Sequence, residues 1–330
     1  MKAVIPVAGI GSRLRPHTHT QPKALIPVAG KPILAHIIDS LIEAGFTDFV
    51  FIIGYLGEKI EEYVQSKYPH LNNEFVVQTV REGIGHALWM AGKYIENEDQ
   101  LLIALGDTVF DMDMKEYMNQ PYSSLGVKKV EDPRRFGVVE LDEQGFINRM
   151  VEKPAVPVSN IALVGIYKIK EVPALMEALK YNIDNDIRTK NEYQLTDALM
   201  RMISLGGKIV TYNVENWFDC GKKDALLETN AVLLQKPEFT TVAVNTASTI
   251  IIPPVNIDPT AVVKNSIIGP NVSIGARAII ENTIIKESII GPDAEIRNSV
   301  LHDSLIGNES ALRGYSQSLN LGDSTEIDYQ

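Results

Sequence analysis

The residues of this chain best suited to chemistry form a basic, glycine-containing loop near residue 10. Gly9 and Gly11 follow a short apolar stretch, and Arg13 and Lys23 come soon after them. No carboxylate precedes Asp39, although the 330-residue chain carries a formal net charge of −11. Glycine leaves backbone N–H groups open to an anion, and the neighbouring cations neutralise its charge. The pattern therefore indicates a site for a highly charged phosphate ligand.

Two common phosphate-binding motifs do not fit this loop. A dinucleotide fingerprint needs a third glycine where the helix packs on the strand, and Leu14 occupies that position. A Walker loop needs Gly-Lys-Ser/Thr at the start of a helix, and the sequence contains no such run. Lys23 instead follows Pro22, and further prolines keep the segment extended or turning. We expect the next helix to begin near Pro32.

Two aspartates add a second kind of chemistry. Asp107 follows the apolar segment 101–105 and should project from the C-terminal end of a buried strand, where open α/β sheets bind ligands. Asp219 follows another expected strand, residues 208–214. Either aspartate alone would be read as a turn or N-cap residue. Brought together, two carboxylates can hold one Mg²⁺ while substrate phosphates complete its coordination.

The elements that position these residues alternate between strand and helix up to about residue 236. This alternation predicts an α/β domain with a largely parallel sheet. Strands are expected over residues 49–53, 74–79 and 100–105. Helices are expected over residues 58–68, 86–95, 171–179, 194–205 and 224–234.

A repeat replaces this pattern after residue 240. The tetrads Asn265-Ser-Ile-Ile, Asn282-Thr-Ile-Ile and Asn298-Ser-Val-Leu recur at short intervals. A period this short predicts a solenoid in which each coil buries one face on the next. A β-sandwich would need longer strands with polar alternation. The recurring apolar positions are Ile268, Ile274, Ile280, Ile285, Ile290, Ile296, Leu301, Ile306 and Leu312.

The signature loop resembles that of a known enzyme family. Gly9-x-Gly11-Ser12-Arg13-Leu14-x-Pro16, followed by Pro22-Lys23, is similar to the loop of the sugar-1-phosphate nucleotidylyltransferases, or NDP-sugar pyrophosphorylases. Ser12 departs from the usual threonine but keeps the hydroxyl. The C-terminal spacing resembles the hexapeptide-repeat left-handed β-helix of the long members. The closest resemblance is to the glucose-1-phosphate thymidylyl- and uridylyltransferases.

This resemblance implies a fold class and a domain division. The fold is α/β, with a Rossmann-like nucleotide-diphospho-sugar transferase domain and a mostly parallel sheet, followed by a left-handed parallel β-helix of hexapeptide repeats. The catalytic domain is expected over residues 1–238, a linker over 239–250 and the β-helix over 251–330.

The resemblance also implies residue roles. Gly-Asp after an apolar strand and Trp-x-Asp-x-Gly are the family's patterns for metal ligands, which assigns Asp107 and Asp219 to Mg²⁺. The expected catalytic cations are Arg13, Lys23 and Lys153. The expected nucleotide-binding residues are Ala8, Gly9, Gly11, Ser12, Gln78 and Gly83. The expected sugar-binding residues are Gly137, Glu152 and Asn160.

The base-binding residues favour a pyrimidine. The amide of Gln78 offers a donor and an acceptor, which matches the imide edge of uracil or thymine, and a backbone group of Gly83 can add a second hydrogen bond. Ile84 stands where many relatives have Thr or Leu, and His86 is expected to be a structural residue that opens a helix. Thr108 stands where glucose-specific thymidylyl enzymes often have Asn, which leaves the sugar open.

The expected reaction transfers a nucleotidyl group from dTTP or UTP to a sugar 1-phosphate, with glucose 1-phosphate as the leading acceptor. One alternative is a UDP-N-acetylglucosamine pyrophosphorylase whose β-helix also transfers an acyl group. His302 is the only histidine in that region, and we expect it to be a plain surface residue. Another alternative is a non-catalytic regulatory or scaffold subunit. Such relatives tend to lose the loop cations or the metal carboxylates, all of which are present here.

Composition limits the partners and the cellular compartment that we expect for this protein. The acidic balance argues against a nucleic-acid partner. Cys220 is the only cysteine, which excludes a disulfide framework within one chain and suits a reducing compartment. No apolar run has the length of a membrane span, and Pro6 and Arg13 interrupt the short apolar run at the N-terminus. We expect a cytoplasmic homo-oligomer that associates through its β-helix.

Overall fold

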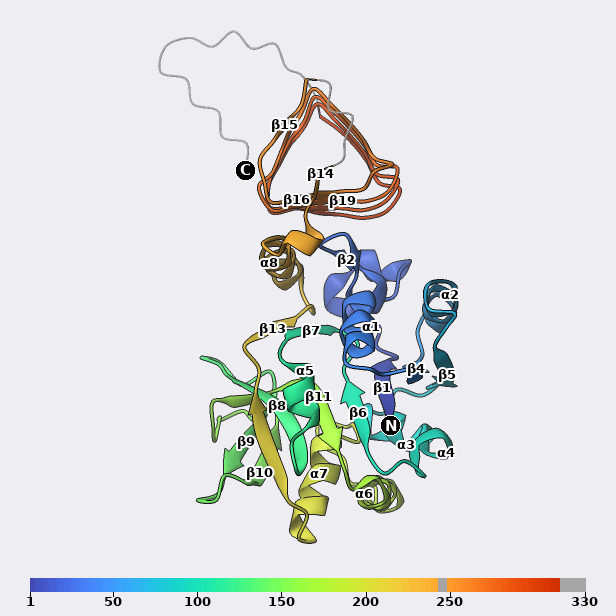
Figure 1. Cartoon of the computed structure of the whole chain (residues 1–330), viewed down its shortest axis with the longest axis vertical. Helices are drawn as coiled ribbons and strands as arrows, with labels where there is room; N and C mark the ends of the chain where they lie inside the picture. The colour runs from blue at the N-terminus through green and yellow to red at the C-terminus, as the bar shows by residue number, and fades with distance from the viewer. Residues whose placement is uncertain (243–247, 315–330) are drawn as a thin grey trace. The chain divides into compact units, whose positions relative to one another are not determined.

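The computed structural model describes residues 1–242 and 248–314, and it divides into two compact units (Figure 1). The first unit comprises Met1–Pro27 and Lys31–Thr229, and the second comprises Val28–Gly30 with the residues from Asn230 onward. The domain boundary near residue 238 and the linker over 239–250 stay proposals. Residues 243–247 and 315–330, which fall within the expected linker and β-helix, lie outside the described residues.

A nine-stranded sheet forms the first unit, in the order β10-β9-β11-β6-β1-β4-β5, with β8 paired to β11 and β12 paired to β8. Strands β1, β4, β5 and β6 are mutually parallel, whereas β11 runs antiparallel to β6, β8 and β9. The strands are β1 (Lys2–Val7), β4 (Asp48–Ile53), β5 (Asn72–Val77), β6 (Leu101–Ala104), β8 (Ser123–Lys129), β9 (Gly137–Leu141), β10 (Ile147–Glu152), β11 (Ile161–Ile169) and β12 (Ile209–Asn213). The Rossmann-like, mostly parallel core predicted from the sequence is confirmed.

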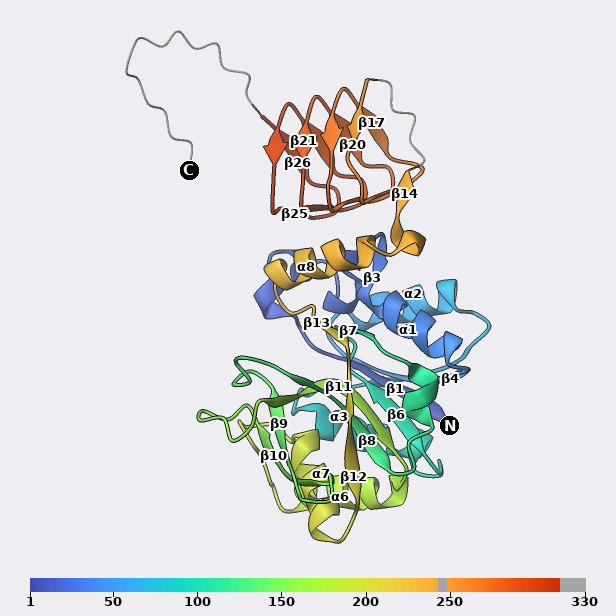
Figure 2. The same cartoon turned by 60° about the vertical axis from the view of Figure 1, so that its left-hand side comes forward.

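Helices cover both faces of this sheet (Figure 2). The helices of the first unit are α1 (Ile33–Glu43), α2 (Gly57–Lys67), α3 (Ile84–Met90), α4 (Gly92–Ile95), α5 (Met114–Met118), α6 (Val172–Asp184) and α7 (Leu195–Ser204), and α8 (Lys223–Leu234) begins in the first unit and ends in the second. Apolar residues of α3, α4, α6 and α7 pack on one face in a continuous core, and α1 and α2 lie on the other (Figures 1 and 2). Central strands with two covered faces are apolar at nearly every position, which explains why β4 and β6 could be located from the sequence.

Two predicted elements differ from the structure. The helix expected over residues 86–95 is two helices, α3 and α4, which meet at Ala91. The helix expected over 171–179 continues as α6 to Asp184. None of the helices in the described part of the chain is both long and apolar enough to cross a membrane.

Short elements complete the first unit and lead out of it. They are the 3₁₀ turns η1 (Ser12–Leu14), η2 (His17–His19), η3 (Lys23–Leu25) and η4 (Pro237–Phe239), with strands β2 (Pro27–Val28), β3 (Lys31–Pro32), β7 (Thr108–Asp111) and β13 (Asn216–Asp219). Strands β7 and β13 pair with each other in a separate two-stranded sheet.

The second unit contains the left-handed β-helix, whose coils form the three faces of a triangle (Figure 1). Its parallel sheets have the orders β14-β16-β19-β22-β25, β15-β18-β21-β24 and β17-β20-β23-β26. The strands are β14 (Thr241–Val242), β15 (Ile250–Ile251), β16 (Val255–Ile257), β17 (Val262–Lys264), β18 (Ile267–Ile268), β19 (Val272–Ile274), β20 (Ile279–Glu281), β21 (Ile284–Ile285), β22 (Ile289–Ile290), β23 (Glu295–Arg297), β24 (Val300–Leu301), β25 (Leu305–Ile306) and β26 (Ala311–Arg313).

The recurring apolar residues fill the interior of the β-helix. Those from Ile268 to Ile296 are at most 1% exposed, Leu301 and Ile306 are partly buried, and Leu312 is 36% exposed. The exposed fraction of these side chains rises toward the end of the described stack. Each inner coil packs between two neighbouring coils, whereas the last described coil packs against one described neighbour. The solenoid prediction is confirmed.

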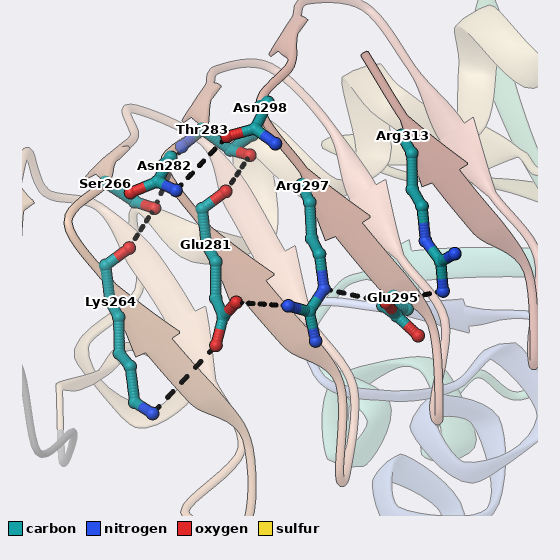
Figure 3. Close-up of polar contacts among 9 residues, drawn as sticks. All are labelled: Lys264, Ser266, Glu281, Asn282, Thr283, Glu295, Arg297, Asn298 and Arg313. Atoms are coloured by element: carbon teal, nitrogen blue, oxygen red, sulfur yellow. Dashed lines mark hydrogen bonds and ion pairs between the residues drawn. The ribbon is translucent and has the colours of Figure 1, made fainter. Parts of the chain in front are cut away.

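The repeated asparagines lie at corners of the triangle. Asn265, Asn282 and Asn298 have φ values of 48°, 52° and 50°, in the left-handed region that asparagine tolerates better than most residues. Asn282 Nδ2 donates to Asn298 Oδ1 at 3.1 Å (Figure 3). Beside this asparagine row, Glu281 accepts from Arg297 Nη1 at 2.6 Å. Corner conformation therefore explains the residue type that marks each repeat.

Candidate active site

The candidate site lies at the carboxyl edge of the parallel strands. Strand β1 has β4 on one side and β6 on the other, so the strand order reverses at β1. Loops that leave the two strands at such a reversal diverge and form a crevice that binds ligands. The loop with Gly9 follows β1, and Asp107 follows β6. The Gly106 N–H donates to the Pro6 carbonyl at 3.2 Å, which ties the two strand ends together.

A cavity of about 480 Å³ opens over this crevice. Lys23 and Asp107 line it, together with all six residues that the sequence assigned to the nucleotide: Ala8, Gly9, Gly11, Ser12, Gln78 and Gly83. Arg81 and Glu192 also line it, and the sequence did not indicate either of them. The signature loop and the expected base-binding residues therefore share one cavity.

The path of the signature loop depends on Gly11. Its φ is +68°, and a Cβ atom there would lie 2.9 Å from the Cβ of Lys23 and 3.0 Å from the Cγ2 of Thr18. The carbonyl of Gly11 accepts from Thr18 Oγ1 at 2.9 Å. Glycine thus allows the loop to fold back until Lys23 lies against its start, which no larger residue would permit without displacement.

Lys23 and Asp107 form an ion pair inside the cavity. Lys23 Nζ lies 2.5 Å from Asp107 Oδ2, and the lysine side chain is 11% exposed whereas the aspartate is 41% exposed. Desolvation raises the pKa of Asp107, but the charge and hydrogen bond of Lys23 outweigh it, with Thr108 and Arg13 adding to their effect. The pKa is therefore lowered from its usual value. The carboxylate is ionised at neutral pH.

A second cavity of about 540 Å³ begins at Asp107 and extends toward strands β9 and β10. Its lining includes the predicted residues Arg13, Gly137, Glu152, Lys153 and Asp219. Asp107, Ile84, Leu105 and Glu192 line both cavities. The structure therefore brings the expected catalytic cations, metal ligands and two of the expected sugar-binding residues to one continuous crevice.

Asp219 reaches this crevice through the small sheet. In the antiparallel pair β13–β7, Asp219 lies opposite Thr108. The Cys220 N–H donates to the Asp107 carbonyl at 3.1 Å. Arg135 Nη2 lies 3.3 Å from Asp219 Oδ2, so this carboxylate is also paired with a cation. Pairing with β7 brings residue 219 to the position next to residue 107.

Glu152 and Lys153 both line the second cavity. Glu152 accepts from Thr196 Oγ1 at 3.4 Å, and Lys153 Nζ lies 3.3 Å from Glu152 Oε1. A Cβ atom at Gly137 would lie 3.0 Å from Glu152 Oε2 and 2.9 Å from Leu163 Cδ1. Glycine at 137 therefore leaves room for the Glu152 carboxylate, and the part of Gly137 in sugar binding stays a proposal.

Asn160 lies outside both cavity linings. Its side chain is exposed, and its backbone carbonyl accepts from the Val130 N–H at 3.0 Å. The structure does not bring this residue together with Glu152, and its role in sugar binding stays a proposal.

Several lining residues escaped the sequence analysis. They are Arg81, Arg134, Arg135, Glu192, Gln194 and Thr196. The adjacent arginines at 134 and 135, directly before Phe136-Gly137, were a usable signal because two cations beside an expected sugar phosphate site are informative. Residues 192–196 carry no such signal, since only the tertiary fold brings them to the crevice.

Asp107 and Asp219 fit a magnesium ion. Carboxylate oxygens are hard ligands of the kind Mg²⁺ takes in proteins, usually one or two per ion with phosphate and water oxygens beside them. Both line the second cavity, and the lowered pKa keeps Asp107 in the ligating form. Within residues 1–242 and 248–314, no group of three or more His, Cys, Asp or Glu side chains is arranged to hold a metal.

Comparison with known proteins matches residues 2–236 to a described protein family. The model of the family described as "Nucleotidyl transferase" matches residues 2–236. The low-salt glycan biosynthesis nucleotidyltransferase Agl11 of Haloferax volcanii is 33% identical over 243 residues, which cover 71% of this chain and 66% of the relative. The bifunctional protein GlmU of Methanocaldococcus jannaschii is 38% identical over 241 residues, which cover 72% of this chain and 55% of the relative.

Two further comparisons bear on the reaction. The glucose-1-phosphate thymidylyltransferase of Streptomyces griseus is 32% identical over 246 residues, covering 72% of this chain and 67% of the relative. A crystal structure of UDP-glucose pyrophosphorylase complexed with UDP-glucose superimposes with a TM-score of 0.62 at 25% identity. That match covers 71% of this chain and 98% of the other. The matches to Agl11 and GlmU span about two thirds and about half of those relatives.

Proposed function

Because the chain belongs to the nucleotidyl transferase family, we propose that it transfers a nucleotidyl group from a nucleoside triphosphate to a sugar 1-phosphate and releases pyrophosphate. One observation carries this proposal: two cavities meet at Asp107. The first is built from the glycine loop, Lys23 and Gln78, which suit a triphosphate and a base. The second contains Glu152 and Lys153, which suit sugar hydroxyls and a sugar phosphate.

The residues divide the chemistry between them. Backbone groups of Gly9 to Ser12 face the triphosphate, and Lys153 holds the sugar phosphate so that one of its oxygens attacks the α-phosphorus in line with the departing pyrophosphate. The sugar phosphate is largely ionised near pH 7, so the attacking oxygen needs no general base. Arg13 and Lys23 neutralise the charge on the phosphates. Catalysis therefore consists mostly of positioning and charge neutralisation.

Mg²⁺ is the cofactor we propose, with Asp107 and Asp219 as its protein ligands. When bound, it supplies positive charge to phosphate oxygens and fixes their orientation. The Lys23–Asp107 pair has a role in this arrangement. Lys23 balances the aspartate when no metal or phosphate is present and can move onto a phosphate oxygen when they bind.

We propose glucose 1-phosphate and dTTP as the leading substrate pair, with UTP and either glucose or N-acetylglucosamine 1-phosphate close behind. One relative is named as a glucose-1-phosphate thymidylyltransferase and one solved structure as a UDP-glucose pyrophosphorylase. These names support dTTP and UTP as candidate nucleotides and glucose 1-phosphate as the candidate sugar phosphate. Thymine and uracil differ by one methyl group, which a pocket distinguishes by only about 1–3 kcal/mol.

The test is pyrophosphate release with Mg²⁺ across dTTP, UTP, CTP, ATP and GTP, each with several sugar 1-phosphates. Rapid release with one pair supports the proposal and identifies both substrates. Release with no pair, from folded protein that binds a nucleotide, would overturn it in favour of a regulatory subunit. The presence of Arg13, Lys23, Asp107 and Asp219 in one crevice favours the enzyme.

The β-helix is proposed to mediate homo-oligomerisation. Ile250, Ile284 and Val300 are 60%, 43% and 70% exposed and occupy equivalent positions along sheet β15-β18-β21-β24. Acyl transfer would need a catalytic histidine, and His302 is a 66% exposed side chain beside Asp303. A cytoplasmic setting also stays a proposal, supported by the buried, single cysteine.

A further inference from the structure

The amide of Gln78 is held by one backbone carbonyl and by one side chain that lies outside the cavity lining. Gln78 is 6% exposed, and its Nε2 lies 3.1 Å from the Gly83 carbonyl oxygen and 3.3 Å from His86 Nδ1. His86 is 13% exposed and is not part of the lining of the nucleotide cavity, whereas Gln78 and Gly83 are. His86 therefore contacts the residue proposed to bind the base without facing the cavity itself.

The donors and acceptors in this cluster fix the orientation of the amide. A backbone carbonyl only accepts hydrogen bonds, so the Gln78 atom that faces Gly83 must be the NH₂ group. That group only donates, so His86 Nδ1 must accept and carries no proton. The ring proton then lies on Nε2, which faces Glu82 Oε2 at 3.6 Å. Each assignment follows from the hydrogen-bonding pattern.

Glu82 is itself held in place. Its Oε1 lies 3.0 Å from Arg188 Nη2, and its backbone carbonyl accepts from the Tyr193 N–H at 2.7 Å. The Arg188 guanidinium lies 4.1 Å from the centre of the Tyr193 ring and pairs with Asp186 at 2.6 Å. A carboxylate fixed on the far side of His86 favours the Nε2–H tautomer, because that proton points at a negative charge.

We propose that Arg188, Glu82 and His86 form a relay that locks the Gln78 amide with its carbonyl oxygen toward the base. With both amide hydrogens directed at Gly83 and His86, Oε1 is the atom left to contact a ligand. Gln78 then offers the base an acceptor, and not the donor and acceptor expected from the sequence. An acceptor at this point selects a base edge that donates N–H, such as the imide of uracil or thymine. Where uracil and thymine carry the imide N–H, cytosine carries an unprotonated ring nitrogen, which is a hydrogen-bond acceptor. This nitrogen would face Oε1 with no hydrogen between the two atoms.

This inference rests on the proposed function, because it deepens the assignment of Gln78 as a base-binding residue. It makes His86 and Glu82 positioning residues that act on base selection through Gln78. A buried acceptor facing another acceptor leaves both unsatisfied, which is the basis of strong rejection by hydrogen-bonding sites. Without His86, the Gly83 carbonyl is the one remaining partner of the NH₂ group, so the amide is held less firmly and its rotation to donate to cytosine costs one hydrogen bond instead of two.

Two substitutions at His86 separate the lock from packing. Asparagine (His86→Asn) keeps an acceptor near the Nδ1 position, and leucine (His86→Leu) has a similar size but no acceptor. Equilibrium binding of UTP and CTP is measured for wild type and both variants, with thermal unfolding to verify the fold. We expect wild type to prefer UTP by roughly 10-fold or more, His86→Asn to keep most of this preference, and His86→Leu to reduce it at least about fivefold.

A second variant covers the case in which His86→Leu does not fold. Glu82→Leu leaves His86 in place but removes the carboxylate that favours its Nε2–H tautomer, so the UTP preference should again fall. The relay is overturned if the folded variants keep the wild-type ratio of UTP to CTP affinity, if they weaken the binding of UTP and CTP equally, or if wild type shows no preference for UTP.

Pyrophosphate release is measured separately. Selective UTP binding without turnover would reject the proposed reaction alone, and turnover with an unchanged ratio in the variants would reject the relay alone.

Discussion

Asp219 lies opposite Thr108 in the antiparallel pair β13–β7, and Thr108 is the residue that follows Asp107 in the chain. The Cys220 N–H also donates to the Asp107 carbonyl, which fixes the two segments against each other. This two-stranded sheet is separate from the main sheet of the first unit. It carries the second carboxylate to the carboxyl edge of β6, where the first is already positioned. Backbone pairing therefore brings together the two residues proposed to hold Mg²⁺.

Replacement of Lys23 or Asp107 by alanine should nearly abolish turnover. A single charge-stabilising group in such a site is typically worth roughly 10²–10³ in rate. Lys23→Ala also leaves the Asp107 carboxylate without its 2.5 Å partner. The measurement is steady-state pyrophosphate release, with thermal unfolding to show that the fold is kept. Lys31→Ala is the control, because Lys31 pairs with Asp39 and lines neither cavity. Wild-type turnover in Asp107→Ala would refute the metal assignment.

Alanine at Gly83 should lower stability, whereas alanine at Gly9 should leave it unchanged. No atom lies within 4 Å of a Cβ placed at Gly9, so Gly9→Ala should fold normally, yet the methyl group enters the triphosphate cavity. A Cβ at Gly83 would lie 2.6 Å from the Tyr193 carbonyl oxygen, and the φ of Gly83 is +100°. Gly83→Ala should cost about 1–3 kcal/mol of stability.

The two glycine variants are compared by denaturant unfolding and by the KM for the nucleotide. We expect Gly9→Ala to raise the KM with the free energy of unfolding unchanged. A Gly9→Ala enzyme with wild-type KM would show that triphosphate does not approach the loop backbone closely.

Much of the fold could be predicted because its signals are local. Buried strands such as β4 and β6 are continuous apolar runs, and each coil of the β-helix repeats one apolar pattern around asparagine corners. Strand order is different, since it depends on pairing between distant segments that no local pattern records. The antiparallel strand β11 inserts between β6 and β9, and nothing in the sequence indicated this position.

The candidate site shows the same division. The glycine loop and Gly106-Asp107 could be found from the sequence because glycine, cations and a strand end occur within a few residues. Arg188 and Glu82 are 106 residues apart, and Arg135 and Asp219 are 84 apart, so their meeting required the structure. Asn160 was assigned by resemblance alone, and it is the one assigned residue that lines neither cavity.

The single cysteine should be unreactive in the folded protein and should weaken the fold at high pH. Burial raises the pKa of Cys220 to about 12 from a usual value of 9.0. A raised pKa means that the folded state favours the neutral thiol. The resulting stability is fully present below about pH 9 and is lost as the pH rises toward about 12.

Thiol labelling and unfolding test the cysteine prediction. Labelling with a disulfide reagent near neutral pH should be far slower in native than in denatured protein. The free energy of unfolding should fall more steeply between pH 9 and 12 in wild type than in Cys220→Ala, which removes the contribution of other alkaline groups from the comparison. Equal slopes would show that the thiol does not contribute.

Charged residues on the exposed apolar row of the β-helix should dissociate the proposed oligomer. Ile284 and Val300 are in register on β21 and β24, so aspartate at both positions places two like charges within one contact surface. Light scattering should show a smaller particle for this double variant than for wild type. Leu205→Asp is the control, because Leu205 is 67% exposed and lies outside the β-helix. An unchanged particle mass for the double variant would show that this row of residues is not the contact surface.

Alanine substitutions in the β-helix should differ in cost according to their place in the stack. Ile280 is fully buried and lies between Val263 and Ile296 of the neighbouring coils, so Ile280→Ala should cost about 2–5 kcal/mol. Leu312 is 36% exposed in the last described coil, and Leu312→Ala should cost less than about 1 kcal/mol.

Both tryptophans lie before residue 230, so tryptophan fluorescence reports on the first unit. Hydrogen exchange of amides in residues 250–314 is therefore the suitable measurement. Since each coil contacts only its neighbours, protection in Ile280→Ala should fall most in the coils on either side of residue 280. Equal losses in the two variants would show that burial along the stack does not set its stability.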